Sequence, residues 1–274
     1  MCDIKIFDVR PCKADSGFLV DDGKTSILYD SGFGFTGDAL AQNISQVLGN
    51  RKLDYIFLTH SHYDHALGSA YVKKRYPDAK VVAGEYASKI FAKDSAKRLM
   101  RELDRKFADK CGIGEYEDLC DSLCVDIAVC DGDEIDAGNI RFRAIHLPGH
   151  TKCSFGFYHS ERKLLLSSET LGVYVGDGVV VPSYLVGYEM TISSIRKSKE
   201  FDIENILTPH FGLLDKSETK VFLSACEDCR TALSDYNVSC NNVCSVSLLD
   251  TKSLGLTIAA VLGRTYTLFM SKEL

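Results

Sequence analysis

The chain has 274 residues, of which 45% are hydrophobic and 26% charged, as in an ordinary globular protein with a substantial core. Its formal net charge of −6 gives no general attraction to nucleic acid or to an anionic membrane. No apolar run approaches the roughly 18 residues that a membrane span needs, and the first residues do not resemble a secretory signal. Eleven cysteines, an odd number without such a signal, indicate reduced thiols. We therefore expect a cytoplasmic protein without nucleic-acid or membrane partners.

Short apolar strands alternate with helices along the first half of the chain. The predicted strands cover residues 4–9, 18–29 (interrupted by a turn at 21–23), 55–58 and 80–83. The predicted helices cover residues 39–48, where Leu40, Ile44 and Leu48 have helical spacing, and 66–75, which ends before Pro77. A charge-rich stretch from about 85 to 123 has helical character and interrupts the strand pattern.

The strand pattern resumes in the second half. Strands are predicted at 125–129, 140–146, 153–159, 164–167 and 206–208, and helices at 191–199 and 216–236, with a further element at 253–270. Two strand-rich halves joined by helices favour two stacked sheets with helices outside.

Four potential metal ligands fall within six positions of the segment 60–65. His60 and His62 are two residues apart, so in an extended segment both side chains point the same way. Asp64 and His65 follow as the chain turns into a helix, where they can face a second point. Imidazole and carboxylate groups are the ligands that zinc and iron accept in water-activating sites. The segment therefore predicts a metal site, provided that distant partners exist.

Two further histidines stand at strand ends. His150 lies in a Leu-Pro-Gly-His-Thr turn, and His210 follows Pro209 just past a short apolar strand. Strand ends can hold ligands rigidly while they leave access to solvent. His146 and His159 lie within predicted strands, and we interpret them as core or supporting groups.

The order of these motifs resembles the metallo-β-lactamase superfamily, whose pattern is HxHxDH, a Pro-Gly-His-Thr turn, a bridging acid and a last histidine. The resemblance runs from Ile4 to about Gly212, includes the Asp-Ser-Gly turn at Asp30, and does not cover residues after about Leu214. It implies an α/β fold, a four-layer αββα sandwich at 1–214 with a helical insertion at about 85–123. We expect residues 215–274 to form a helical C-terminal extension that caps the active site.

The same resemblance implies two metal ions. His60, His62 and His150 would hold one ion, and Asp64, His65 and His210 the other. The bridging acid is usually Asp, whereas this sequence has Glu169, which keeps the charge but adds one methylene. Two divalent ions are expected, with zinc the first choice and iron or manganese left open by this departure.

The expected activity is that of a dinuclear metal-dependent hydrolase. A metal-activated hydroxide would attack a small ester, thioester, lactone or phosphodiester, with Asp64 as the catalytic residue that moves a proton. The absence of an obvious basic cluster near the C-terminus weighs against a glyoxalase II type. Two alternatives remain: a diiron-type redox protein, although flavodiiron proteins usually have Glu where this chain has His62, and a low-turnover regulatory or signalling protein. The partner is a small-molecule substrate, and the oligomeric state is open, with a dimer allowed.

Overall fold

The computed structural model describes residues 3–234, with side chains as far as Cys226. In this range the strands form two six-stranded sheets and one two-stranded hairpin. The first sheet has the order β1 (Lys5–Asp8), β2 (Phe18–Asp21), β3 (Ser26–Tyr29), β4 (Tyr55–Phe57), β5 (Lys80–Gly84), β6 (Ile127–Val129). Its first three strands are antiparallel, and β3 to β6 are parallel.

The second sheet comes almost entirely from the later half of the chain. Its order is β14 (Gly212–Leu214), β13 (Asn205–Thr208), β10 (Leu164–Leu166), β9 (Phe155–His159), β8 (Ile140–His146), β7 (Glu134–Ala137). Strands β8, β10 and β13 run in the same direction, because β9 is antiparallel to both β8 and β10 while β10 and β13 are parallel. The hairpin consists of β11 (Val173–Gly176) and β12 (Val179–Val181).

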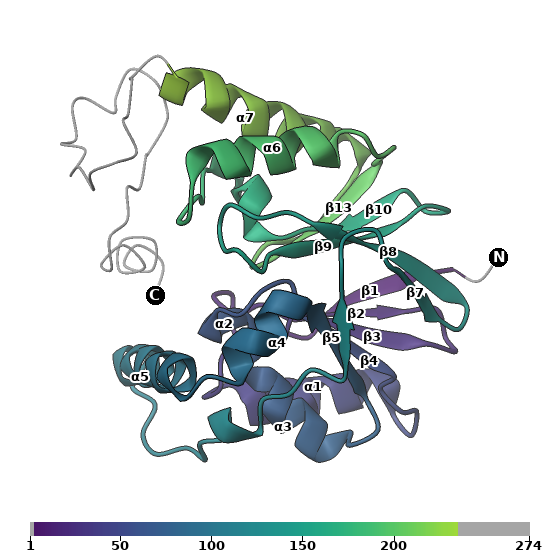
Figure 1. Ribbon diagram of the computed structural model, residues 1–274. Helices are drawn as coiled ribbons and strands as arrows, with labels where there is room; N and C mark the ends of the chain where they lie inside the picture. Colours follow the sequence, from purple (N-terminus) through teal and green to yellow (C-terminus); the bar gives the residue numbers. More distant parts are fainter. Residues whose placement is uncertain (1–2, 235–274) are drawn as a thin grey trace.

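Helices cover the outer face of each sheet, so the molecule has four layers (Figure 1). The helices on the first sheet are α1 (Gly37–Leu48), α2 (Tyr63–Ala66), α3 (Gly68–Arg75), α4 (Glu85–Phe91) and α5 (Asp94–Lys110). The helices on the second sheet are α6 (Tyr188–Ser198) and α7 (Lys216–Ser234). Short 3₁₀ segments lie at η1 (Cys120–Ser122) and η2 (Glu169–Leu171). The expected αββα sandwich is therefore confirmed.

Three apolar cores fill the spaces between the four layers. Side chains along β10 alternate between two of these cores. Leu164 and Leu166 face the first sheet, and Leu165 between them faces the helices of the second sheet. The central core joins the two sheets through aromatic side chains, with the rings of Phe57 and Phe157 4.7 Å apart. This packing fixes one sheet against the other, and with them the loops at their edges.

Most predicted elements are present, with shifted ends. The stretch at 85–123 is helical through α4, α5 and η1, although residues 111–119 between them are not. Strands β7 and β14 and the hairpin β11–β12 were not predicted. The helix predicted at 216–236 is α7 up to Ser234, whereas the element predicted at 253–270 and the rest of the expected cap at 215–274 lie outside the described residues. The proposed domain division stays a prediction. Within residues 3–234 no helix is long and apolar enough to cross a bilayer.

Candidate metal centre

Strand direction brings the predicted ligands to one edge of the sandwich. The segment 60–65 follows β4 of the first sheet. His150, Glu169 and His210 follow β8, β10 and β13, which run in the same direction in the second sheet. Loops from the carboxyl ends of strands in both sheets therefore meet, as expected where strands share a direction.

The predicted ligands form two groups. The first cluster is His60, His62, His150 and Glu169, and the second cluster is Asp64, His65 and His210. Within each cluster one atom from every residue lies within 4.8 Å of the others. The same residues were expected to hold the two metal ions, and Glu169 groups with the ligands of the first ion. Their role as ligands stays a prediction.

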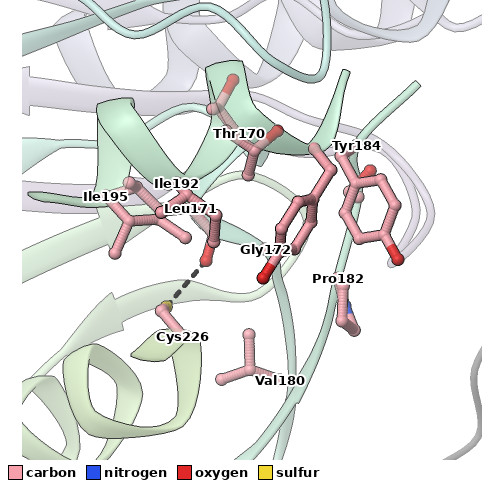
Figure 2. A pocket seen from close by; sticks show the side chains of 12 residues that line it. Thr170, Leu171, Gly172, Val180, Pro182, Tyr184, Ile192, Ile195 and Cys226 are labelled. Carbon is pink, nitrogen blue, oxygen red and sulfur yellow. Dashed lines mark hydrogen bonds between the residues drawn. The ribbon is translucent and has the colours of Figure 1, made fainter. Parts of the chain in front are cut away.

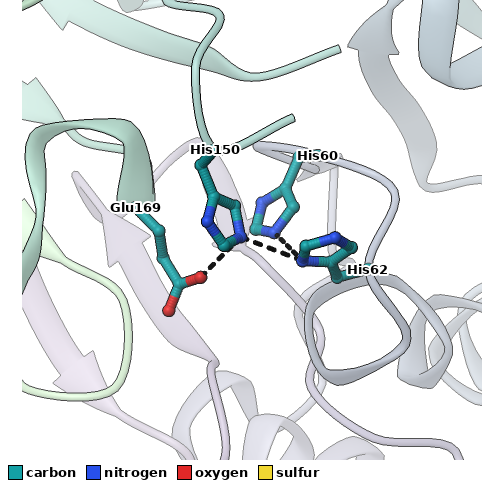
Figure 3. Close-up of side chains that lie close together, drawn as sticks. All are labelled: His60, His62, His150 and Glu169. Atoms are coloured by element: carbon teal, nitrogen blue, oxygen red, sulfur yellow. Dashed lines mark hydrogen bonds and ion pairs between the residues drawn. The ribbon is translucent and has the colours of Figure 1, made fainter. Parts of the chain in front are cut away.

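Three ring nitrogens converge in the first cluster (Figure 3). Nδ1 of His62 lies 3.0 Å from Nε2 of His60 and 2.9 Å from Nε2 of His150. The other ring nitrogens of His60 and His150 bind partners outside the cluster. Nδ1 of His60 contacts the Thr59 hydroxyl at 2.9 Å, and Nδ1 of His150 donates to the Ser183 carbonyl at 3.0 Å. In the neutral rings these two Nε2 atoms are therefore unprotonated and direct their lone pairs inward.

The second cluster has the same organisation. His65 donates from Nδ1 to Asp30 at 2.8 Å, and His210 donates from Nδ1 to the carbonyls of Ala14 at 3.0 Å and Asp15 at 3.2 Å. Their Nε2 atoms face each other at 3.1 Å. With both Nδ1 atoms donating outward, the two Nε2 atoms either share a proton between them or hold a cation in its place.

Glu169 reaches both clusters. It begins η2, just after Ser168, whose hydroxyl accepts from the Thr170 N–H at 3.4 Å. Its Oε2 lies 2.8 Å from Nε2 of His150, and its Oε1 lies 3.3 Å from Nε2 of His210. The longer side chain of Glu therefore spans the gap between a histidine of each cluster.

Oδ1 of Asp64 is buried with no hydrogen-bond partner, and the buried Oε2 of Glu169 has only the ring nitrogen of His150 beside it, at 2.8 Å. Oδ2 of Asp64 lies 3.8 Å from Nε2 of both His65 and His210, too far for a hydrogen bond. Unsatisfied buried carboxylate oxygens are costly unless a cation compensates them. Together with the inward lone pairs, they make this donor set a good fit for two divalent ions.

The electrostatics divide the histidines into two kinds. Burial and the neighbouring rings hold the pKa values of His60 and His62 well below normal, which keeps both rings neutral and ready to ligate. Burial opposes the charged form of His65 too, but the carboxylates of Asp64 and Asp30 outweigh it and raise its pKa to about 9. Protonation in the second cluster thus provides positive charge where an ion would otherwise supply it.

Several residues that support the site were given no role in the sequence analysis. Asp30 follows β3 at the same sheet edge and accepts from both Thr59 and His65, so its position after a strand was an available signal. Ser183 and Arg10, which contact the clusters from distant segments, carry no such signal. His146 contacts the Lys152 carbonyl at 2.9 Å and His159 the Arg141 carbonyl at 2.9 Å, and neither belongs to a cluster.

A pocket adjoins the first cluster (Figure 2). It encloses about 320 Å³, part of it open to solvent, and Thr170 and Ser183, which both contact His150, line it. The remaining lining residues are mostly apolar or aromatic: Leu171, Gly172, Val180, Pro182, Tyr184, Tyr188, Thr191, Ile192, Ile195 and Cys226. The Cys226 thiol donates to the Leu171 carbonyl at 2.7 Å and so ties α7 to this pocket.

Comparison with known proteins identifies the family and supports the fold. The family model described as the metallo-beta-lactamase superfamily matches residues 10–210. The chain belongs to this superfamily. A solved structure of an archaeal superfamily member, ST1585 from Sulfolobus tokodaii, has a TM-score of 0.60 at 21% identity, covering 86% of this chain and 84% of that one. At that identity the likeness shows the fold alone.

Curated superfamily relatives are distant. The metallo-beta-lactamase fold-containing protein ST1585 of Sulfurisphaera tokodaii is 28% identical over 60% of this chain and 62% of its own length. A hydroxyacylglutathione hydrolase of Ectopseudomonas mendocina is 31% identical over 45% of this chain and 35% of its own. Hydroxyacylglutathione hydrolase GloC of Haemophilus influenzae is 26% identical over 70% and 82%, respectively. The chain thus spans less than two thirds of the first two relatives.

Proposed function

We propose that this protein is a dinuclear metal-dependent hydrolase of the metallo-β-lactamase superfamily. One observation carries the proposal: ring nitrogens of five histidines and oxygens of two buried carboxylates converge on two adjacent points. His60, His62 and His150 would hold the first ion, and Asp64, His65 and His210 the second. Glu169 would bridge the two, because its oxygens reach a histidine of each cluster. Zinc is the first candidate, and iron and manganese remain alternatives.

Ions held there would polarise the electrophilic centre of a substrate and lower the pKa of an attacking water molecule. The chain supplies the rest of the reaction. Oδ1 of Asp64 is buried and makes no hydrogen bond, so it can accept the proton that the water loses and return it to the leaving atom. Thr59 and Ser183 keep the protons of His60 and His150 on Nδ1, away from the site.

A small ester, thioester, lactone or phosphodiester remains the proposed substrate class. Two of the relatives described above are hydroxyacylglutathione hydrolases, which is a reason to test thioesters first. The argument against a glyoxalase II type rests on the C-terminal segment, most of which lies outside the described residues. The net charge of −6 supports a small molecule over nucleic acid, and the free cysteines among the described residues support a cytoplasmic location.

The decisive test combines metal content with turnover. Freshly purified protein should contain two metal ions per chain and hydrolyse at least one member of a panel of bis-p-nitrophenyl phosphate, thioesters, esters and lactones. The variants His62→Ala and Glu169→Ala should lose activity and metal. His159→Gln is the matched control, since this buried histidine lies outside both clusters and its ring hydrogen bond to Arg141 can be replaced by an amide.

Other outcomes favour other functions. Protein that contains one ion or none and turns over no panel member contradicts the hydrolase proposal and favours the regulatory alternative. Two iron ions with redox activity but no hydrolysis would instead favour the diiron type.

A further inference from the structure

His210 has an unusual backbone conformation. It lies between β13 and β14 with φ of 62°, in the left-handed region that non-glycine residues seldom adopt. Such a conformation is unfavourable for a non-glycine residue and persists only where the surrounding contacts impose it. The conformation of His210 aims Nε2 at His65 and Glu169. The contacts that impose this backbone conformation therefore also set the geometry of the second cluster.

The loop between β1 and β2 holds both parts of His210. Its ring is fixed through Nδ1, which donates to the Ala14 and Asp15 carbonyls. Its backbone is fixed separately, because Nη1 of Arg10 donates to the His210 carbonyl oxygen. Arg10 makes this contact across 200 positions of sequence.

Arg10 is itself immobilised. Its Nε and Nη2 donate to the two carboxylate oxygens of Asp8 at 2.8 and 2.6 Å, and Nη1 also donates to the Lys13 carbonyl at 3.3 Å. The guanidinium lies 4.6 Å from the centre of the Phe18 ring, and only 10% of the side chain is exposed. A planar fork of donors can satisfy these partners together, whereas a single ammonium group cannot.

We infer that Arg10 is a positioning residue for the second metal ion. It holds the His210 backbone in the conformation that aims Nε2 into the second cluster, and so sets the affinity for that ion without touching it. The inference rests on the proposed two-ion function. The first cluster, whose histidines have other supports in Thr59 and Ser183, does not depend on Arg10.

The test is a titration of metal-free protein with Co²⁺, followed by visible absorption and calorimetry. Wild type should bind two equivalents. Arg10→Ala should bind the first with unchanged affinity and the second at least about tenfold more weakly, as is typical when a group supporting a ligand is removed. Arg10→Lys should be intermediate. Arg141→Ala is the matched control, because Arg141 pairs with Asp136 on the surface, with 67% of its side chain exposed.

The outcomes separate this inference from the function on which it rests. Wild type that binds fewer than two Co²⁺ ions overturns the two-ion function, and the role of Arg10 with it. If wild type binds two, Arg10→Ala that also binds two at wild-type affinity overturns the role of Arg10 alone. Equal weakening of both ions, with a large loss of thermal stability, also overturns it, because Arg10 would then support only the fold.

Discussion

Oδ2 of Asp30 accepts a hydrogen bond from Nδ1 of His65 at 2.8 Å. The same oxygen accepts from the Thr59 hydroxyl at 3.0 Å, and that hydroxyl lies 2.9 Å from Nδ1 of His60. One buried carboxylate therefore orients a histidine of each cluster, the first through Thr59 and the second directly. Asp30 is itself anchored, since its other oxygen accepts from the Thr59 N–H at 2.8 Å.

The Asp30→Asn variant should bind both ions more weakly. Asn tolerates the positive φ of 51° at this position but replaces one acceptor oxygen by a donor, so the three hydrogen bonds from the His65 ring, the Thr59 hydroxyl and the Thr59 N–H cannot all survive. We expect metal affinity to fall by about 10- to 100-fold, measured by competition with a chromogenic chelator. Asp136→Asn on the surface is the control, and unchanged affinity in Asp30→Asn would show that Asp30 does not orient the clusters.

Shortening Glu169 should separate its two contacts. In Glu169→Asp the carboxylate is one methylene shorter and should not reach both His150 and His210, which lie 2.8 and 3.3 Å from its two oxygens. We expect kcat/KM to fall by at least about tenfold, as for loss of an oriented group at a metal site. Metal analysis of the same samples shows whether the variant has lost an ion or keeps both ions in a less active arrangement. Full activity in Glu169→Asp would contradict a need for the longer side chain.

Gly32 should tolerate no side chain. Its φ is 65°, and a Cβ atom there would stand 1.6 Å from Oδ1 of Asp15, a fully buried carboxylate that accepts from the Phe33 N–H at 3.0 Å. We expect Gly32→Ala to lower the free energy of unfolding by more than about 2 kcal/mol. Gly23→Ala is the control, because Gly23 has φ of 86° but no neighbour within 4 Å, and it should cost only about 1 kcal/mol. Urea unfolding of metal-free protein measures both, and equal losses would contradict the steric argument.

Asp104 should make stability depend on pH. Burial outweighs its hydrogen bonds from Tyr116, Gly34 and Phe35 and raises its pKa to about 6, above the value of 3.8 expected when unfolded. Between these values the folded state binds more protons, so this contribution to stability is largest at low pH and is lost as pH rises through about 6. From about pH 5 to about pH 8 the loss should approach 1.4 kcal/mol.

The measurement is urea unfolding of metal-free wild type and Asp104→Asn at both pH values. The side chain of Asn cannot ionise. As pH rises, the unfolding free energy of wild type should therefore fall relative to that of Asp104→Asn. A difference that is constant, or that moves in the opposite direction, would contradict a raised pKa for Asp104.

The candidate histidines could be predicted because they follow strands that the sequence pattern reveals. His60 comes after β4, His150 after β8 and His210 after β13, so strand ends located these histidines, while the resemblance supplied Glu169 and the division into two sets. Strand β7 was missed because Glu134–Ala137 is only four residues long and lies between glycines at 132 and 138, so its charged and apolar alternation is too short to stand out. The hairpin β11–β12 was missed because its valines are interrupted by glycines at 176 and 178.

The supports of the site could not be predicted from pattern. Ser183 meets His150 from the segment before α6, and Arg10 meets His210 from the opposite end of the chain. Such contacts depend on how the layers pack, and an isolated Arg or Ser in a loop has no periodicity to reveal its partner. Whether the C-terminal residues cap the site stays a prediction.

Each cluster draws its members from both sheets. The segment 60–65 belongs to the first sheet, whereas His150, Glu169 and His210 belong to the second. Ions bound to these residues would act as cross-links between the halves of the sandwich, and their binding free energy would add to the stability of the whole domain. Stripping the ions should then lower the melting temperature of both halves in a single transition, so that metal supply controls the lifetime of the folded chain as well as its chemistry.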